Sequence, residues 1–320
     1  MITLGIESTA HTLGIAILKD NRVLCNLRDM YVTEAGGIHP TEAALHHKAI
    51  KYSLLNRALD ETSLRVEDID IIAFSNAPGL APCLLEGMNL ARELNEKHKI
   101  PLVPVNHCIA HLEITKLVTK AKDPVLLYAS GANTQIIAYE GKKYRIFGET
   151  LDTGIGNFLD KFARDLGFGF PGGPKIYELS LKSQNFIELP YVVKGMDVSF
   201  SGIYTNLKNK IGKYPKEDLA YSCQETVFAM LIETAERAMA HTDKKELALG
   251  GGVACNSRLQ EMARIMCKER GAKCFIPENQ YLVDNAAMIG YLGSRMYKKK
   301  KNYVIDINPS ERTDDVEVFW

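Results

Sequence analysis

The spacing of apolar and polar positions divides the chain into two halves that open alike. Residues 1–31 alternate apolar segments with turn residues, as in "LGIESTAHTLGIAIL", and this pattern predicts three antiparallel strands. Residues 39–61 then show the period of a helix, with Pro40 near its start, where a missing N–H does no harm. Strand and helix patterns alternate from there to residue 122, which predicts the order β-β-β-α-β-α-β-α.

The second half repeats this opening. "VLLYASGANTQIIAYEGKKYRIFGETLD" again predicts three strands joined by tight turns, and both halves begin with an apolar strand, a small polar turn and a second apolar strand. Such duplication indicates two related α/β domains, residues 1–122 and 123–293, that face each other with their turns in a shared cleft. We expect residues 294–320 to return to the first domain as a helix followed by a short strand over "TDDVEVFW".

The composition is that of a globular protein without a membrane span. Of the 320 residues, 46% are hydrophobic and 24% charged, no run of eighteen apolar residues occurs, and the N-terminus lacks the features of a signal peptide, so we expect a cytosolic protein. The seven cysteines include no C-x-x-C pair, which argues against a disulfide framework and a zinc ribbon. Because Lys+Arg and Asp+Glu both total 39, any nucleic acid must be held by a local patch or with a partner's help.

The stretch "VNHCIAHLEI" is the first candidate for chemistry. His107 and His111 lie four residues apart, and on a helix this spacing places both imidazoles on one face, where they could bind a metal. A zinc peptidase would need a glutamate directly after the first histidine to activate water, but Cys108 stands there. Tyr128, at the end of a predicted strand, and Asp284, at the start of the last helix, are two further candidate ligands. Without them, an interfacial histidine pair that binds no metal is the simpler interpretation.

Several turns are candidates for binding an anion or a nucleotide. The hairpin turns Glu7-Ser8-Thr9 and Ser130 to Thr134 offer hydroxyls and backbone N–H groups that suit phosphate. "GGGVACNSR", from Gly250 to Arg258, follows a strand and opens a helix, so a ligand could approach its backbone closely. Asp160 could accept hydrogen bonds from ribose hydroxyls or favour the start of its helix. Ordinary loop chemistry is an alternative explanation for each of these features taken alone.

Taken in order, nine motifs resemble the universal family of tRNA threonylcarbamoyladenosine synthesis proteins, in particular its archaeal and eukaryotic branch, the catalytic subunit of the KEOPS complex. The motifs span the whole chain and read "GIESTAHTLGIAI", "HPTEAALHH", "NHCIAH", "YASGANTQIIAY", "GETLDTGIGNFLDKFAR", "PGGP", "KGMDVSFSG", "GGGVACNSRL" and "DNAAMI". The resemblance implies two ribonuclease-H-like domains of the actin, Hsp70 and sugar-kinase (ASKHA) superfamily, with a nucleotide in the cleft between them. This expectation agrees with the duplicated hairpins.

The resemblance also implies roles for individual residues. The family's metal ligands match His107, His111, Tyr128 and Asp284. Its nucleotide contacts match Ser130, Gly131, Ala132 and Asn133 for the phosphate and Asp160, Gly173 and Asn256 for the nucleoside, and the wider set of nucleotide- or substrate-binding positions also includes Tyr128, Ala129, Tyr177 and Glu178. Two positions depart from the family pattern. The turn reads "SGAN" instead of "SGGN", so Ala132 would be strained at a positive φ, and Tyr177 stands where a glutamate is expected, with Glu178 next to it.

The activity that the resemblance implies is transfer of the threonylcarbamoyl group from threonylcarbamoyl-AMP to N6 of adenosine 37 in ANN-decoding tRNAs. It further implies one metal ion per subunit, iron in preference to zinc, and an ATP- or AMP-type nucleotide. The implied partners are tRNA, a small atypical kinase, a small dimer-bridging subunit and a further accessory subunit of KEOPS, without a membrane. Two alternatives stay open: a metallopeptidase, suggested by the paired histidines, and a non-catalytic ATP-binding scaffold.

Overall fold

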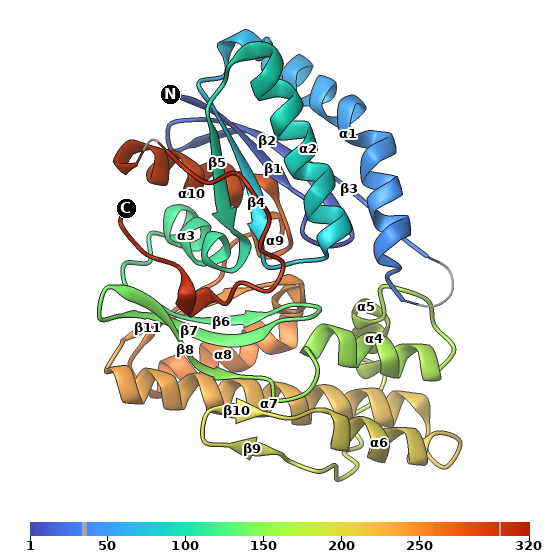
Figure 1. The fold of residues 1–320 in the computed structure, drawn as a ribbon. Helices are drawn as coiled ribbons and strands as arrows, with labels where there is room; N and C mark the ends of the chain where they lie inside the picture. Colours follow the sequence, from blue (N-terminus) through green and yellow to red (C-terminus); the bar gives the residue numbers. More distant parts are fainter. Residues whose placement is uncertain (34–36, 301) are drawn as a thin grey trace.

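Two five-stranded sheets with the same strand order form the framework of the chain (Figure 1). The structure is a computed structural model that describes residues 1–33, 37–300 and 302–320. The first sheet has the order β3-β2-β1-β4-β5, with β1 Ile2–Glu7, β2 Thr12–Lys19, β3 Arg22–Met30, β4 Ile71–Ala77 and β5 Leu102–Asn106. The second has the order β8-β7-β6-β11-β12, with β6 Val125–Ala129, β7 Thr134–Glu140, β8 Lys143–Glu149, β11 Glu246–Gly250 and β12 Lys273–Phe275. The predicted duplication is confirmed.

In both sheets an antiparallel meander leads into parallel strands. β1 pairs antiparallel with β2 and parallel with β4, and β6 pairs antiparallel with β7 and parallel with β11. The parallel strands are buried on both faces because helices cover both sides. In open α/β sheets, ligands bind at the carboxyl ends of such strands. The strands β1, β5 and β6 end at Glu7, Asn106 and Ala129, so these ends are where a site is expected.

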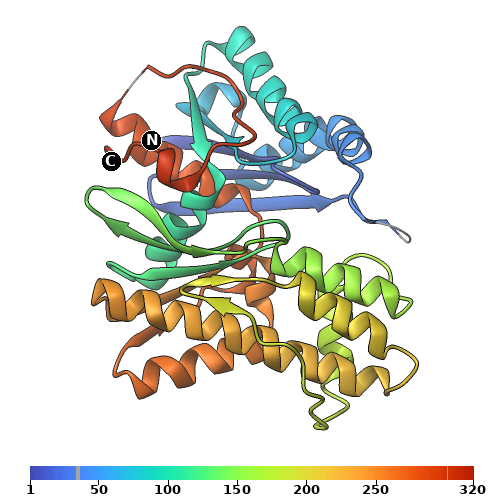
Figure 2. The ribbon, with the colours of Figure 1, turned by 60° about the horizontal axis from the view of Figure 1, so that its bottom comes forward.

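Helices cover the outer faces of the sheets and fill the space between them (Figures 1 and 2). α1 and α2 pack on the outer face of the first sheet and α10 on its inner face, while α7 and α8 pack on the outer face of the second sheet. The bounds are α1 Pro40–Thr62, α2 Ala81–His98, α3 His107–Thr119, α4 Ile155–Asp165, α5 Gly173–Ser180, α6 Ser201–Lys210, α7 Lys216–Thr242, α8 Ser257–Glu269, α9 Asn279–Leu282 and α10 Ala286–Lys299. None of the helices in the described ranges is long and apolar enough to cross a membrane.

α10 packs very closely on the first sheet because glycines remove the side chains between them. A Cβ on Gly5 in β1 would lie 2.2 Å from the carbonyl oxygen of Ala286, and a Cβ on Gly293 would lie 2.3 Å from the Cβ of Ala73 in β4. Larger residues would not fit at this distance. α10 therefore packs on the first domain from its first residue, and the domain boundary expected at residue 293 falls inside a continuous helix.

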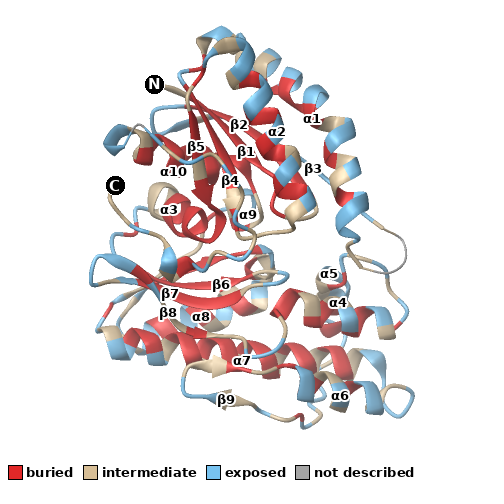
Figure 3. Ribbon diagram, viewed as in Figure 1, coloured by how far each residue is buried: buried red, intermediate tan, exposed pale blue. Residues whose placement is uncertain are grey.

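α3 is buried between the two sheets. It contacts α10 and β4 on one side and β6 and β11 on the other, and all residues from His107 to Thr115 are buried (Figure 3). These nine residues belong to the core and have no solvent-facing surface for polar side chains, whereas the last turn from Lys116 to Thr119 is half-buried. The polar groups of His107, His111 and Glu113 therefore have to be satisfied by partners inside the protein.

The prediction of a strand over residues 313–320 is wrong. Residues 302–320 contain a 3-10 turn at Thr313–Asp315 and, in the part that the structure describes, no strand. The alternation of Val316 and Val318 that suggested a strand instead places apolar side chains against the α3 and α10 core. Among the described residues, the segment pairs with no strand of either sheet and therefore lacks the inter-strand hydrogen bonds that define a β-strand.

A buried carboxylate ties α3 to both domains. Glu113 is 1% exposed and accepts hydrogen bonds from Tyr144 in β8 and from Arg295 in α10, while Nζ of Lys116 lies 3.2 Å from its Oε1. Burial and the charge of Glu113 raise the pKa of Tyr144 far above its ordinary value, so the phenol remains a hydrogen-bond donor. This network fixes the position of α3 relative to the second sheet.

Replacing Arg295 with Met should destabilise the protein, because Glu113 would lose a cation in a buried position. Removing one partner of a buried pair costs roughly 3–5 kcal/mol. Since Arg295 is 35% exposed and Lys116 still pairs with Glu113, we expect a loss of about 2 kcal/mol in the free energy of unfolding. Denaturant unfolding measures it. Lys175→Met, which removes an exposed pair with Glu178, is the matched control, and equal losses in the two variants would contradict the assigned role.

Candidate functional site

The site is built on the first turns of α3, which carry the two histidines. Asn106 ends β5, and its side-chain Oδ1 accepts hydrogen bonds from the N–H groups of Cys108 and Ile109 at 3.1 and 3.2 Å. This cap fixes the residue at which the helix begins, so His107 takes the first position and His111 follows one turn later. The ring centroids of the two histidines are 4.8 Å apart, and both imidazoles lie on one face of the helix.

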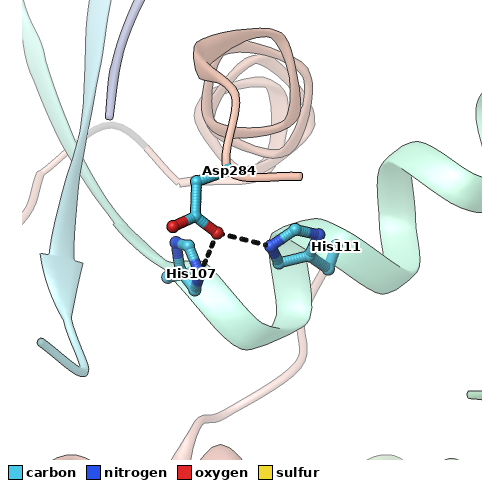
Figure 4. A group of neighbouring side chains, drawn as sticks. All are labelled: His107, His111 and Asp284. Atoms are coloured by element: carbon cyan, nitrogen blue, oxygen red, sulfur yellow. Dashed lines mark hydrogen bonds and ion pairs between the residues drawn. The ribbon is translucent and has the colours of Figure 1, made fainter. Parts of the chain in front are cut away.

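Four side chains from three segments meet beside this helix, three of which are drawn in Figure 4. Oδ1 of Asp284, from the loop before α10, lies 3.4 Å from Nε2 of His107 and 3.4 Å from Nε2 of His111. The phenol oxygen of Tyr128, at the end of β6, lies 2.9 Å from Nε2 of His107. The first domain thus contributes both histidines through α3, β6 of the second domain contributes Tyr128, and the segment between α9 and α10 contributes Asp284.

The spacing of these donor atoms fits a metal ion. In a tetrahedral site with bonds of about 2.1 Å, neighbouring ligand atoms are separated by roughly 3.4 Å. The two distances between imidazole nitrogen and carboxylate oxygen are both 3.4 Å, and the donor atoms of His107, His111 and Asp284 all lie within 4.8 Å of one another. Two imidazoles, a carboxylate and a phenol oxygen form a donor set that suits iron or zinc.

The charges around the site favour a cation. Burial lowers the pKa of His107, but Tyr128, Glu7 and Asp284 outweigh burial and raise it well above the ordinary value. Burial raises the pKa of Asp284, but His107 and His111 lower it more strongly, to well below its usual range. Burial lowers the pKa of His111, whose neutral ring offers a lone pair. A proton on His107 and a metal ion therefore compete for the same position.

Glu7 has a role that the sequence analysis missed. Its carboxylate is 0% exposed, its Oε2 lies 2.9 Å from Nδ1 of His107, and its Oε1 accepts a hydrogen bond from the Thr9 N–H at 2.7 Å. A carboxylate on the second ring nitrogen orients a metal-binding histidine and increases the basicity of the other nitrogen. The available signal was an acidic residue directly at the carboxyl end of a buried strand.

Cys108, which stands in the position of the peptidase glutamate, and Glu113, the acidic residue of α3, both have partners away from the four donor atoms. Sγ of Cys108 faces the second domain, where Nδ2 of Asn133 lies 3.9 Å away. Glu113 is bound to Tyr144 and Arg295 on another side of α3. Activation of a metal-bound water by a neighbouring carboxylate, as in zinc peptidases, therefore has no support from these two residues.

The turn between β6 and β7 lies next to the four donor atoms, because it directly follows Tyr128. Ser130 closes the turn by donating its N–H to the carbonyl of Asn133 at 2.9 Å, and Gly156 at the start of α4 donates to the carbonyl of Ser130 at 3.0 Å. The N–H groups of Gly131 and Ala132 donate to no acceptor among the described residues, so they are available to an anion. The N-terminus of α4 behind the turn adds a positive potential.

Glycines behind this turn make its close packing possible. A Cβ on Gly154 would lie 2.3 Å from the carbonyl oxygen of Gly131. Gly251 has a φ of +88°, and its Cβ would lie 2.3 Å from the carbonyl oxygen of Ala129. Ala132 is not among the described residues with a positive φ, so the strain considered for the "SGAN" turn does not arise.

The residues expected near a nucleoside lie on α4, α5 and α8. Oδ1 of Asp160 accepts a hydrogen bond from the Gly172 N–H at 2.7 Å, next to Gly173, and burial raises the pKa of this carboxyl. The Tyr177 hydroxyl lies 2.7 Å from Oγ of Ser257, which joins α5 to the start of α8 beside Asn256.

Asn256 and Glu178 have other partners. Asn256 caps α8 and donates from Nδ2 to Gln224 at 2.8 Å. Glu178 is exposed and pairs with Lys175 at 3.1 Å, so the structure does not bring its carboxylate to the other candidate residues.

Comparison with known proteins gives close relatives over the full length. The TsaD family model, described as tRNA N6-adenosine threonylcarbamoyltransferase, matches residues 23–291. A tRNA N6-adenosine threonylcarbamoyltransferase of Thermococcus kodakarensis is 56% identical, and the match covers 100% of both chains. A probable bifunctional tRNA threonylcarbamoyladenosine biosynthesis protein of Methanosarcina barkeri is 51% identical over 99% of this chain and 59% of that protein.

Solved structures with low identity share the fold. HypF of T. kodakarensis has a TM-score of 0.68 at 16% identity, covering 93% of this chain and 48% of that chain. The activator of 2-hydroxyisocaproyl-CoA dehydratase from Clostridium difficile, solved with bound ADPNP, has a TM-score of 0.57 at 12% identity, covering 95% and 100%. The expected two-domain ASKHA fold is therefore confirmed. The chain is a transferase and belongs to the tRNA N6-adenosine threonylcarbamoyltransferase family.

Proposed function

We propose that this chain transfers the threonylcarbamoyl group from threonylcarbamoyl-AMP to N6 of adenosine 37 in ANN-decoding tRNAs. The observation that carries the proposal is the position of the four donor side chains, His107, His111, Tyr128 and Asp284, directly beside a turn with two free N–H groups. An adenylate needs both features, since its phosphate is an anion and its carbamoyl end has to be held nearby. The family membership supports the same reaction.

The chemistry of the acceptor explains why no base is needed to activate water. The N6 amine of adenine is a weak nucleophile because its lone pair is delocalised into the ring. The donor must therefore arrive activated, as a mixed anhydride with AMP as the leaving group. The orientation of Cys108 and Glu113 away from the site agrees with this mechanism and disfavours a metallopeptidase. Adenosine 37 lies in a single-stranded loop, from which a base can be splayed into a pocket.

The residues of the chain bind and orient the donor. The N–H groups of Gly131 and Ala132 would donate to the phosphate of the adenylate, and the start of α4 would stabilise the charge that remains on AMP. His107, His111, Tyr128 and Asp284 would hold a metal ion, which supplies Lewis acidity and a template for the carbamoyl end or phosphate. Much of the remaining acceleration comes from holding amine and carbonyl together.

The finer assignments belong to the same proposal. The metal is iron, with zinc as the alternative, because a phenol oxygen completes the donor set. The nucleoside is contacted by Asp160, Gly173, Tyr177 and Asn256. Glu178 does not reach the nucleoside itself and contributes only through the adjacent Tyr177. The chain works in the cytoplasm as the catalytic subunit of KEOPS, together with a small atypical kinase, a dimer-bridging subunit and a further accessory subunit.

Transfer is tested by incubating the chain and these partner proteins with threonylcarbamoyl-AMP and unmodified ANN-decoding tRNA. Mass spectrometry of the tRNA nucleosides should detect threonylcarbamoyladenosine, and His111→Ala should reduce its amount by at least about a hundredfold because a ligand of the ion is lost. His98→Ala, on the outer helix α2, is the control and should be fully active. Absence of product with the wild-type chain would favour the ATP-binding scaffold instead.

Tyr128→Phe should remove the visible absorption of the protein while the metal ion stays bound. A phenolate bound to ferric iron absorbs visible light, and the three remaining ligands can still hold the ion. The visible spectrum should therefore lose its band, while elemental analysis should still find about one iron per chain. A colourless, iron-free preparation of the wild-type chain with full activity would remove iron from the account.

Gly251→Ala should weaken nucleotide binding. The new Cβ would meet the carbonyl oxygen of Ala129 at 2.3 Å and displace the turn that follows it. Gly271→Ala is a matched control, since Gly271 also has a positive φ, +64°, but no atom lies within 4 Å of its added Cβ. Calorimetric titration with ATP should show about a tenfold weaker affinity for the first variant and wild-type affinity for the second. Equal affinities would argue against this turn as the phosphate site.

A further inference from the structure

The segment from Ile305 to Thr313, which we name the C-terminal strap, connects the two domains along the edge of the site. It is bound to the first domain by hydrogen bonds from the Asn308 N–H to the carbonyl of Asn76 at 2.8 Å and from the Gly79 N–H to the carbonyl of Pro309 at 3.1 Å. It reaches the second domain with Arg312, whose Nη2 lies 3.0 Å from Glu149 in β8. The strap (deep red in Figure 1) is therefore fixed at both ends.

Between these two ends, the strap contacts the residue that caps α3. Oε2 of Glu311 accepts a hydrogen bond from Nδ2 of Asn106 at 2.9 Å, and Asn106 is 5% exposed. The other side-chain atom of Asn106, Oδ1, accepts from the N–H groups of Cys108 and Ile109. An acceptor on Nδ2 determines which way the amide faces, because the opposite orientation would place an N–H group against the N–H groups of the helix. Glu311 therefore selects the orientation in which Asn106 works as a cap.

Thr313, the last residue of the strap, contacts both halves of the site. The buried Thr313 donates from Oγ1 to Oε1 of Gln135 in β7 at 3.3 Å, just after the turn with the free N–H groups. Its side chain also contacts Cys108, next to His107. The strap thus joins the start of α3 to the start of β7, although the two elements belong to different domains.

We propose that Glu311 is a positioning residue for the metal centre. By holding Asn106, it fixes the start of α3, and with it the place from which His107 directs Nε2 toward Asp284 and Tyr128. A negative charge near the N-terminus of α3 also stabilises the helix through its dipole. The proposal rests on the metal centre proposed above. Glu311, which lies 204 positions after His107 in the sequence, thus helps to position that histidine for metal binding.

The test compares three variants of the full-length chain by amide hydrogen exchange in chelator-treated protein and by zinc affinity in competition with a chelator. Glu311→Ala should speed the exchange of the Cys108 and Ile109 amides and weaken zinc binding roughly tenfold. Glu311→Gln should stay close to wild type, because an amide oxygen still accepts from Asn106. Glu317→Ala removes an exposed carboxylate of the same C-terminal segment and should change neither quantity.

A second pair of variants separates positioning from general loss of stability. Asn106→Asp keeps the cap acceptor but places a carboxylate against Glu311, so it should weaken zinc binding. Adding Glu311→Gln to this variant supplies an N–H donor for the new carboxylate and should restore both exchange protection and affinity. The proposal is overturned if Glu311→Ala leaves exchange and affinity at wild-type values, or if the double variant is no better than Asn106→Asp. If the wild-type chain binds neither zinc nor iron, the metal centre itself is refuted, while the exchange data still decide whether Glu311 fixes the start of α3.

Discussion

The burial of α3 between two sheets is the constraint on which the site depends. The enclosed part of α3, from His107 to Thr115, must satisfy its polar side chains inside the protein, and it carries two histidines and a glutamate within seven residues: His107, His111 and Glu113. Each of the two domains supplies some of the partners. Glu113 is neutralised by Arg295 from the first domain and bound by Tyr144 from the second, which locks the helix in place. The Nε2 atoms of both histidines lie next to Asp284, and that of His107 also lies next to Tyr128, while Nδ1 of His107 faces Glu7.

Duplication explains why the site lies at a domain junction. Both sheets have the same strand order, and the carboxyl ends of their parallel strands meet at α3. The first sheet places the carboxylate of Glu7 there, and the second places Tyr128 and the turn that follows it. A group that is bound by donors from both domains is held correctly only when the domains are closed on each other. The C-terminal strap contributes to this arrangement because it contacts Asn106 in the first domain and Gln135 in the second.

The parts of the fold that could be predicted from the sequence are those that local hydrophobic periodicity determines. Alternating apolar residues in "LGIESTAHTLGIAIL" and "LLYASGANTQIIAY" give the hairpins, and their recurrence gives the duplication. The last strand was predicted wrongly because Val316 and Val318 alternate, whereas strand formation needs a free neighbouring edge that local sequence does not reveal. The helical face of His107 and His111 follows from spacing, and the position of Asp284 at the start of the last helix makes it a candidate ligand, but its approach to His111 across 173 residues cannot be derived from local sequence; its role as a ligand is implied by the family resemblance. Glu7 was assigned to an anion-binding turn because its contact with His107 depends on the register of β1 against β5 by way of β4.

The central claim is that two imidazoles, a carboxylate and a phenol oxygen bind one ion at the domain junction. X-ray absorption spectroscopy of the metal-loaded chain tests this claim most directly, because imidazole rings give a characteristic multiple-scattering pattern around the absorbing atom. The account predicts a first shell of nitrogen and oxygen at about 2.0–2.2 Å with the scattering of two imidazoles. A shell without imidazole scattering, or a sulfur atom at about 2.3 Å as Cys108 would give, would contradict it.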